Sequence, residues 1–309
     1  MVNMAQQQGS SLNDKEIKFF ISVVIPVYNA LEDVKLCIDS VVKNFDFTNG
    51  EVILVNDKSN EETTDYLNSV VEKYSNFLLL SNSENLGFVK TCNKGIKQSK
   101  GDIVVLLNSD TKIPKGFNEK ISNCFKSDDM IGVASPIASS SWLFNIPIKK
   151  NYSIDKMNSE IQRLNVAKYP LIPSAEGFCF CIRRSVIDAI GGLDELYGRG
   201  YHEEVDFSYR AINAGFKVVL IDDLYVFHKA HASFGKKAGD KLVKQNNKIF
   251  RERWGNFRQE YEEKIGFVNP VYELRRKLYP FKYWLFSKEK TTSAKIIKIC
   301  GIPLKFKKK

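Results

Sequence analysis

The chain has 309 residues and a formal net charge of +10, with 43% hydrophobic and 27% charged residues. A chain of this length and composition can bury a substantial core, which excludes disordered, collagen-like and disulfide-scaffold proteins. Residues 271–309 contain 12 Lys and Arg against 2 Asp and Glu, so residues 1–270 are neutral overall. The position of the charge therefore argues against a globular body that binds nucleic acid.

The sequence gives no signal for secretion or for a membrane span. The first 20 residues are polar, and the longest apolar run, at 103–107, is far shorter than a span. The six cysteines are therefore expected to be free thiols in a reducing, cytoplasmic compartment. Cys179 and Cys181 alternate in an apolar run without the partners of a zinc site, so we expect them in the core.

Strand and helix patterns alternate through the first half of the chain. Apolar, β-branched runs predict strands at 19–27, 51–55, 77–80, 102–107 and 131–135. Apolar residues at helical spacing predict helices at 31–44, 61–73, 89–98 and 118–125. This order is typical of an α/β fold with a mostly parallel central sheet and helices on both faces.

The second half of the chain is less regular in pattern. Residues 139–173 are rich in Ser, Lys and Asn and are expected to form a mobile loop region. Further strands are predicted at 175–182, 217–221 and 224–227, and helices at 184–190 and 241–258. The expected organisation is a polar lead at 1–18, an α/β domain at 19–260 and a basic, aromatic C-terminal extension at 261–309.

Polar residues follow each of the first four predicted strands, at 26–29, 56–59, 82–87 and 108–110. In an open α/β sheet, ligands bind outside the carboxyl ends of the strands. One polar loop at such an edge means little. Four in succession predict a binding site there.

Two residues at strand ends are candidate metal ligands. Asp110 follows the strand at 102–107 and could bind a divalent cation together with a diphosphate, or it could cap the turn that follows. His228 follows the strand at 224–227, where a neutral imidazole could be a second ligand or a hydrogen-bonded structural residue.

A dense acidic cluster is the candidate for general-base chemistry. On a helix, Glu203 and Asp206 share a face, and Arg210 can pair with Asp206. Glu204 then points elsewhere and is free to act as a base in a cleft. The alternative is a solvated acidic helix start, which the neighbouring aromatic residues disfavour.

Taken together and in this order, several segments resemble the family 2 glycosyltransferases, which have the nucleotide-binding fold called GT-A. The matching segments are 22–29, 55–59, 85–88 with Asn93, 101–110, 177–183, 191–195, and 201–210 with His228. The resemblance covers about residues 20–260. It is greatest to the branch that makes bacterial surface polysaccharides, which includes many rhamnosyltransferases.

The resemblance implies a nucleotide-sugar donor and a role for each matched residue. Asp57 would bind the uracil or thymine base. The base and ribose pocket would be lined by Pro26, Val27, Tyr28 and Asn29. Other donor contacts would come from Asn85, Lys90 and Asn93. The motif Asn108-Ser109-Asp110 stands where the family has DxD and lacks the first carboxylate, with Asp110 and His228 as ligands of Mn²⁺ or Mg²⁺.

The acidic cluster matches the family's ED motif, with Glu204 in place of the catalytic Asp and with Glu203 and Asp206 as alternatives. The expected activity is an inverting transfer of a sugar from a UDP-sugar or dTDP-rhamnose to a saccharide hydroxyl, on an acceptor that could be polyprenyl-linked. One alternative is a non-catalytic relative that binds a sugar nucleotide or acts as a scaffold. The sequence disfavours a dinucleotide oxidoreductase, because no GxGxxG follows any predicted strand.

The C-terminal extension interleaves basic residues with aromatic ones, which are Tyr279, Phe281, Tyr283, Trp284, Phe286 and Phe306. This pattern favours contact with an anionic membrane surface, and hence a peripheral enzyme on the cytoplasmic face of the cell membrane. The alternatives are stacking on single-stranded nucleic acid, a solvated tail, or a subunit contact in a homo-oligomer. We expect no nucleic acid.

Overall fold

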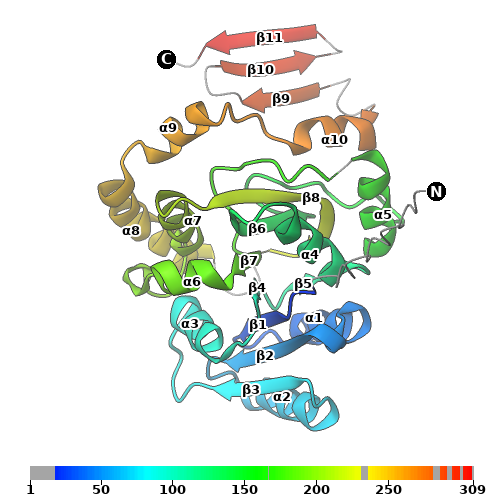
Figure 1. Cartoon of the computed structure of the whole chain (residues 1–309), viewed down its shortest axis with the longest axis vertical. Helices are drawn as coiled ribbons and strands as arrows, with labels where there is room; N and C mark the ends of the chain where they lie inside the picture. Colours follow the sequence, from blue (N-terminus) through cyan, green and yellow to red (C-terminus); the bar gives the residue numbers. More distant parts are fainter. Residues whose placement is uncertain are drawn as a thin grey trace, which may run out of the picture.

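An eight-stranded mixed sheet forms the centre of the structure (Figure 1). The computed structural model describes residues 18–165, 167–230, 236–280, 286–290, 294–299 and 302–307. Within these ranges the strand order is β3-β2-β1-β4-β7-β6-β8-β5. The predicted polar lead, apart from residue 18, lies outside the described residues.

The first half of the chain builds the parallel part of the sheet. Strand β1 pairs in parallel with both β2 and β4, and β2 pairs in parallel with β3. The strands are β1 (Ile21–Val27), β2 (Gly50–Asn56), β3 (Phe77–Ser81) and β4 (Ile103–Leu107). The helices between them are α1 (Leu31–Asn44), α2 (Glu61–Lys73) and α3 (Phe88–Gln98), and the short helix η1 (Phe47–Asn49) precedes β2. The predicted alternation is confirmed.

The second half adds antiparallel strands. Strand β7 (Cys179–Arg183) runs antiparallel between β4 and β6 (Ile131–Ala138). Strand β6 is parallel to β8 (Lys217–His228), and the short β5 (Thr111–Lys112) pairs with the end of β8. The helices here are α4 (Phe117–Ser127), α5 (Ile154–Leu164), α6 (Arg184–Ile190), η2 (Glu195–Tyr197) and α7 (Glu203–Asn213).

The region at 139–173 is more regular than expected, because it contains helix α5. The Ser153 side chain accepts a hydrogen bond from the Lys156 N–H at 3.1 Å and caps the helix start. Met157 and Ile161, four residues apart on one face, are fully buried. The stretch is mostly polar, so its sequence did not indicate a helix, although the helix has one apolar face that packs on the core.

The strands predicted at 217–221 and 224–227 are one strand, β8. Asp222 and Asp223 interrupt its apolar run, and a register shift against β6 between Pro136 and Ile137 accommodates them. The Asp222 carboxylate accepts hydrogen bonds from the side chain of Asn165 and from the backbone N–H of residues 168 and 169. These hydrogen bonds allow the bulge to carry the Asp222 carboxylate inside a buried strand.

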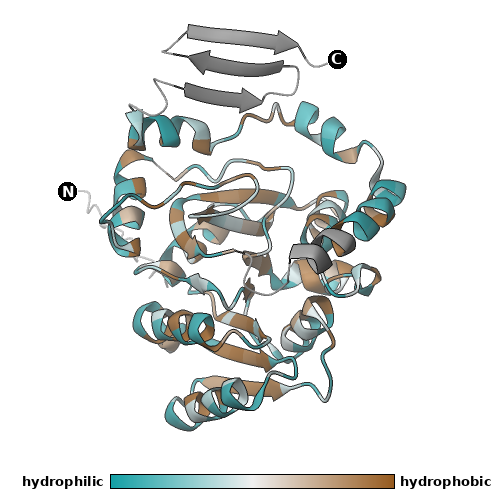
Figure 2. Ribbon diagram, turned by 180° about the vertical axis from the view of Figure 1, so that it is seen from behind, coloured by the Kyte–Doolittle hydropathy of each residue, from teal (hydrophilic) through white to brown (hydrophobic). Residues whose placement is uncertain are grey.

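Helices cover both faces of the sheet, as predicted. On one face, alternate residues of β1 such as Val23 and Ile25 share a cluster with α1, α2 and α4. On the other face, Val24 shares a cluster with α3, α5, α6 and α7. Figure 2 shows the same division as apolar strands between helices whose outer surfaces are polar.

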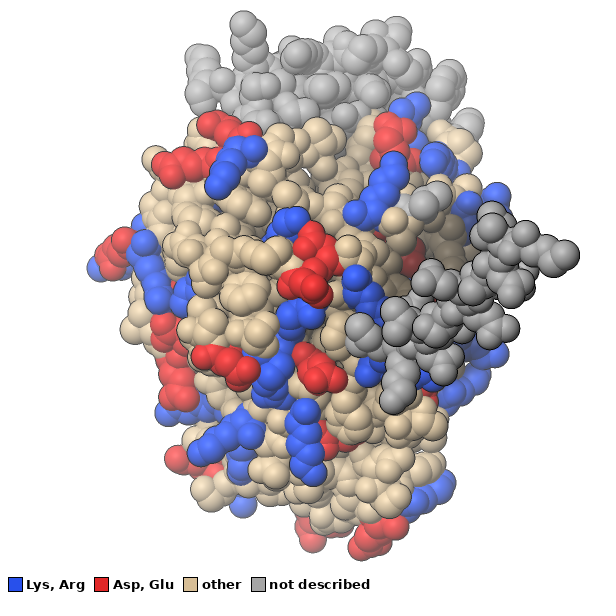
Figure 3. Space-filling model, in the orientation of Figure 1, with Lys and Arg blue, Asp and Glu red and all other residues tan. Residues whose placement is uncertain are grey.

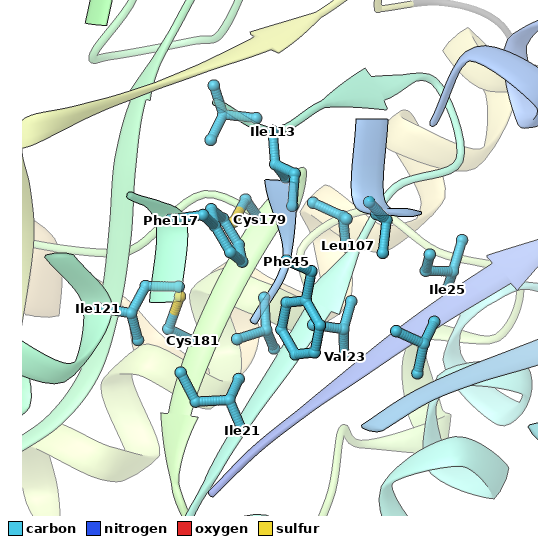
Figure 4. Packing of buried hydrophobic residues seen from close by; sticks show 14 of the residues in the cluster. Ile21, Val23, Ile25, Phe45, Leu107, Ile113, Phe117, Ile121, Cys179 and Cys181 are labelled. Atoms are coloured by element: carbon cyan, nitrogen blue, oxygen red, sulfur yellow. The ribbon is translucent and has the colours of Figure 1, made fainter. Parts of the chain in front are cut away.

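Cys179 and Cys181 lie in the hydrophobic core, as expected, beside Phe117 and Ile121 (Figure 4). Cys37, Cys92 and Cys124 are likewise buried and free, whereas Cys300 lies outside the described residues. Burial raises the pKa of the Cys37 thiol to about 12. These thiols therefore act as small apolar side chains.

The chain continues through α8 (Lys236–Trp254), α9 (Phe257–Lys264) and α10 (Val271–Leu278). Val271, Leu274 and Leu278 are buried in the cluster that contains α3 and α7, so the core extends beyond residue 260. Strands β9 (Phe286–Lys290), β10 (Ala294–Ile299) and β11 (Ile302–Lys307) form a separate antiparallel sheet. Phe281, Tyr283 and Trp284 lie outside the described residues. No helix within the described ranges is both long enough and apolar enough to cross a membrane.

Candidate active site

The loops after β1 and β2 are bound to each other at the carboxyl edge of the sheet. The Asn29 N–H donates to Ser59 Oγ at 2.9 Å, and the Asn60 N–H donates to Asn29 Oδ1 at 2.8 Å. Asn29 and Ala30 both have positive φ, at 55° and 56°, a conformation that non-glycine residues rarely adopt. Tyr28 remains 42% exposed. The sequence therefore maintains a strained, cross-linked turn where the first two strands end.

Asp57 is buried at the end of β2 and organises the loop after β3. Its Oδ1 accepts hydrogen bonds from Asn82 Nδ2 at 2.8 Å and the Leu86 N–H at 2.7 Å, and its Oδ2 accepts one from the Gly87 N–H at 2.9 Å. An ionised carboxylate can accept about four hydrogen bonds, so capacity for one more donor remains.

The three residues predicted to contact the donor after β3, which are Asn85, Lys90 and Asn93, differ in the partners that they already have. Asn93 binds the backbone of Leu193, because its side chain donates to the Leu193 carbonyl at 2.8 Å and accepts from the Leu193 N–H at 2.9 Å. It therefore joins α3 to the chain before η2, and one N–H of its amide remains for a further acceptor. Lys90 is half-exposed and lies 3.9 Å from Glu195. Asn85 accepts a hydrogen bond from Arg199.

Asn108, Ser109 and Asp110 follow β4 as predicted. The Asn108 N–H donates to the Phe178 carbonyl at 2.9 Å, which holds this turn against the start of β7. Asn108 Oδ1 is enclosed and has no hydrogen-bond partner among the described residues. Ser109 is partly exposed and Asp110 is buried.

The structure brings Asp110 and His228 together. His228 Nε2 lies 3.5 Å from Asp110 Oδ1, and His228 Nδ1 lies 2.8 Å from the Ser140 carbonyl oxygen. The carbonyl can only accept, so Nδ1 carries the proton and the lone pair of a neutral imidazole sits on Nε2, facing the carboxylate. The imidazole also stacks on Phe178 with ring centroids 5.1 Å apart.

This donor set suits a divalent cation that takes further ligands from a substrate. One carboxylate oxygen and one imidazole nitrogen face the same point, with the imidazole oriented from behind by a backbone carbonyl. Among the described residues, no group of three or more His, Cys, Asp or Glu side chains is placed to hold a metal. A cation here would need oxygen ligands from a diphosphate or from water.

Asp206 has a structural environment. It is fully buried and forms the predicted ion pair with Arg210, Nε to Oδ2, at 2.8 Å. Its Oδ1 accepts hydrogen bonds from Trp254 Nε1 at 2.8 Å and from the Tyr197 hydroxyl at 3.1 Å. Arg253 Nη1 also lies 3.2 Å from this oxygen. The carboxylate is therefore surrounded by donors and does not face a cleft. The geometry thus separates Asp206 from the other two acidic residues of the cluster.

Glu203 and Glu204 each have an enclosed Oε2 without a hydrogen-bond partner among the described residues. Glu203 is only 5% exposed, and its carboxylate lies beside Gly200. The Glu204 side chain lies against Gly177, where an added Cβ would be 3.5 Å from its Cγ. Burial raises the pKa of Glu204 to about 7, and burial together with the charge of Glu204 raises the pKa of Glu203 well above its usual value.

A third carboxylate, Glu176, belongs to the same cluster and was not predicted from the sequence. It is 8% exposed, its Oε1 accepts the Leu143 N–H at 2.7 Å, and its Oε2 is unpartnered within the described part of the chain. Burial raises its pKa, and its charge contributes to the raised pKa of Glu204. The available signal was an acidic residue inside the apolar run predicted as a strand at 175–182.

Residues 176–178, which lead into β7, connect all of these groups. Glu176 contacts the loop after β6, and Gly177 contacts Glu204 on α7. Phe178 stacks on His228 and accepts the Asn108 N–H through its carbonyl. Three consecutive residues thus place the end of β4, the end of β8 and the start of α7 around one site. Buried acidic groups with raised pKa values and unpartnered oxygens are typical of functional sites.

The family model for glycosyl transferase family 2 matches residues 22–191, which is more than half of the chain. The chain belongs to this family. The matched segment contains the first four strand ends and the segment leading into β7. The family 2 assignment made from the sequence motifs is therefore confirmed, and the protein is a glycosyltransferase.

The sequence of this family 2 member is similar to those of curated relatives from an archaeon and a bacterium. It is 24% identical over 230 residues to glycosyltransferase AglE of Haloferax volcanii, which covers 73% of this chain and 70% of the relative. It is 36% identical over 95 residues to a poly(ribitol-phosphate) beta-glucosyltransferase of Bacillus spizizenii, which covers 30% of this chain and only 15% of the relative.

Solved structures show that the family 2 chain has the GT-A fold. One is a mannosyltransferase of Pyrobaculum calidifontis in complex with GDP-Man and Mn²⁺, with a TM-score of 0.55 and 17% identity, covering 74% of this chain and 62% of the other. Another is GalNAc-T7 with UDP, GalNAc and Mn²⁺, with a TM-score of 0.61 and 16% identity, covering 86% of this chain and 56% of the other. The predicted fold class is confirmed.

Proposed function

We propose that this family 2 glycosyltransferase moves a sugar from a nucleoside diphosphate donor to a saccharide hydroxyl, with inversion at the anomeric carbon and Glu204 as the general base. The observation that carries the proposal is the enclosed, unpartnered carboxylate oxygen of Glu204. It lies against Gly177, next to the residue that contacts both His228 and the end of β4.

Glu204 suits the base role better than its neighbours. Burial raises its pKa to about 7, so a large fraction of the side chain is ionised near neutral pH and can still accept a proton. Asp206 is already surrounded by donors, and Glu203 is more deeply enclosed beside Gly200. In the reaction, Glu204 takes the proton of the acceptor hydroxyl while the hydroxyl oxygen bonds to the anomeric carbon. The bond from that carbon to the diphosphate breaks on the opposite face.

The donor would lie along the carboxyl ends of β1, β2 and β4. Asp57 retains hydrogen-bonding capacity for the imide of uracil or thymine, and the strained turn at 28–30 would flank the base and ribose. Asn85 and Lys90 remain candidates for donor contacts. Asn93 is also a candidate, because Leu193 uses only one of the two N–H groups of its side-chain amide. The donor is a UDP-sugar or dTDP-rhamnose in this proposal.

Asp110 and His228 would hold Mn²⁺ or Mg²⁺, with Asn108 and Ser109 beside the diphosphate. Such a cation would neutralise negative charge on the departing diphosphate. The proposal is supported by the orientation of His228 Nε2 toward Asp110 and by the Mn²⁺ named with two structures of the same fold.

The acceptor in this proposal belongs to bacterial polysaccharide synthesis and is carried on a polyprenyl lipid. The Bacillus spizizenii relative supports the first part, since by its name it is a poly(ribitol-phosphate) glucosyltransferase. The net charge of +10 in residues 271–309 supports a peripheral location on an anionic membrane.

A Glu204→Gln variant tests the base assignment. We expect its turnover to fall about 10²–10⁴-fold while nucleotide affinity stays unchanged, because a general base contributes this much and does not touch the nucleotide. Glu260→Gln, an exposed change on α9, is the matched control and should retain full activity. Turnover of Glu204→Gln at the wild-type rate would overturn the assignment.

A further inference from the structure

The loop after β6 reaches the same edge of the sheet as the donor loops but lies on the other side of the site. Strand β6 is antiparallel to β7, which is antiparallel to β4, so β6 and β4 run in the same direction (Figure 1). In the sheet order, β7 and β6 lie beyond β4 on the side away from β1 and β2. The loop at 139–146 therefore borders the site opposite the proposed nucleotide pocket.

The loop is anchored before residue 142 to the candidate metal ligand. Ser139 Oγ donates to the His228 carbonyl at 2.9 Å and accepts the His228 N–H at 2.8 Å. The Ser140 carbonyl accepts the hydrogen bond from His228 Nδ1 at 2.8 Å. Ser139 and Ser140 thus have fixed positions relative to His228.

The loop is anchored again directly after residue 142. The Leu143 N–H donates to Glu176 at 2.7 Å, and the Leu143 carbonyl accepts from Asn269 Nδ2 at 2.9 Å. The Asn145 carbonyl accepts from Arg275 Nε on α10 at 2.7 Å. Phe144 and Ile146 are fully buried in the core. The backbone on this side is held by the carboxylate cluster and by the C-terminal helix.

Between these anchors, the Trp142 side chain is 86% exposed, the highest value among the large hydrophobic side chains that the structure describes. Its flanking backbone is fixed, so its exposure does not reflect a freely moving segment. A tryptophan presents about 150–250 Å² of surface that would be buried in an ordinary core position. The chain has three tryptophans, and this one is held in solvent between His228 and Glu176.

We propose that Trp142 is the stacking platform of an acceptor subsite that binds a saccharide ring. This inference rests on the proposed function and names the side of the site from which the acceptor hydroxyl approaches Glu204. A pyranose has a face of C–H groups that packs on an aromatic ring, while its hydroxyls remain available for hydrogen bonds. A flat aromatic beside a few polar groups is the composition such a ligand requires.

The surroundings of Trp142 favour a sugar over a protein or a lipid surface. Docking of a protein or a membrane uses a contiguous apolar patch of several hundred Å². Trp142 is preceded by Ser139, Ser140 and Ser141, and the exposed Val268 stands next to Asn269, which bonds the Leu143 carbonyl. An exposed aromatic ring among polar residues, with one aliphatic side chain on the adjoining segment, matches one sugar ring.

Fluorine NMR on protein labelled with 5-fluorotryptophan tests the subsite directly. The Trp142 resonance is assigned by its loss in Trp142→Phe, and the full chain is titrated with methyl glycosides of glucose, galactose, mannose, N-acetylglucosamine and rhamnose. We expect at least one glycoside to shift the Trp142 resonance saturably. The Trp254 resonance should not move, because its indole N–H is bonded to Asp206. No shift with any glycoside up to its solubility limit would overturn the inference.

Kinetics provide a second readout with a matched control. With the glycoside that binds, Trp142→Ala should raise the acceptor KM about 10-fold, the loss expected for one good aromatic contact, and leave the donor KM and donor hydrolysis unchanged. Trp142→Phe should retain most of the affinity. Met130→Ala removes an exposed apolar side chain at the start of β6, at the opposite edge of the sheet, and should change nothing. An unchanged acceptor KM in Trp142→Ala would contradict the proposal.

UDP and dTDP binding, measured on the same samples, separates this inference from the proposed function. Nucleotide binding together with an unmoved Trp142 resonance would overturn the subsite alone. A shifted Trp142 resonance in a protein that binds no nucleoside diphosphate would support the saccharide subsite and overturn the proposed function.

Discussion

Three glutamates with enclosed carboxylate oxygens give the site its chemical character at the scale of single residues. Glu176, Glu203 and Glu204 each keep an unpartnered oxygen within the described structure, which costs stability in a folded protein. Burial raises the pKa of each, the charge of Glu204 adds to the effect at Glu203, and the charge of Glu176 adds to it at Glu204. Groups that are unfavourable for folding and adjacent in space are expected where function requires them.

The raised pKa of Glu204 predicts a pH-dependent cost in stability. Between 4.5 and about 7, the folded state keeps a proton that the unfolded state has lost. The free energy of unfolding therefore falls as the pH rises through this window. Glu204→Gln removes the cost, so it should be more stable than wild type by about 1–3 kcal/mol above the window and equal to it below. Urea unfolding on both sides of the window measures this difference, and equal stability at both pH values would contradict it.

The sequence identified most residues of the site, but it did not show which hydrogen-bond partners each of them has. Asp110, His228 and the acidic cluster could be selected because strand ends and helix spacing place them. The engagement of Asn93 with Leu193 could not, because it depends on a contact 100 residues away in the chain. Glu176 was missed because only the fold shows that the start of β7 lies beside α7.

At the scale of elements, helix α7 is fixed by one buried ion pair. Asp206 and Arg210 join four residues apart, and Tyr197 and Trp254 complete the hydrogen bonds of the carboxylate. Arg210 also donates to the carbonyls of Ile190 and Gly192, which tie α7 to the end of α6. This network sets the direction from which Glu203 and Glu204 enter the site.

Asp206→Ala should destabilise the protein by about 3–5 kcal/mol, because it leaves Arg210 without its buried partner. Glu160→Ala, which removes an exposed pair with Arg163 on α5, should change the stability little, because solvent screens such a pair. Equilibrium unfolding in urea compares the two variants. A cost for Asp206→Ala as small as that of the control would contradict the structural role.

Element bounds were predictable where the apolar pattern is unbroken. The predicted helices at 31–44, 61–73 and 184–190 match α1, α2 and α6 residue for residue. Strand β8 was split in two because paired aspartates resemble a turn, and only the bulge against β6 explains them. Helix α5 was missed because its sequence is mostly polar. The few apolar residues on one of its faces are enough to hold it against the core.

At the scale of the whole molecule, the charge is divided between a neutral body and a basic C-terminal part. The face in Figure 3 shows acidic and basic side chains interspersed, without a broad field of one sign. The net charge of +10 belongs to residues 271–309, which begin with the core helix α10. The body therefore offers no broad basic field for nucleic acid on that face.

The proposed membrane contact predicts that the full chain co-sediments with phosphatidylglycerol vesicles and that added salt weakens the binding. A chain ending at residue 280 should lose it, because about 1 kcal/mol of attraction per basic residue is removed. Phosphatidylcholine vesicles serve as the uncharged control. Equal binding of both chains to both lipids would contradict an electrostatic tail.

The most direct test of the whole account is calorimetric titration of UDP, dTDP, GDP and CDP, each with and without Mn²⁺, into wild type and Asp110→Asn. We predict that UDP or dTDP binds, that Mn²⁺ strengthens the binding in wild type, and that this gain is lost in Asp110→Asn. Absence of binding by every nucleotide, with or without Mn²⁺, would contradict the proposed donor site at the carboxyl edge of the sheet.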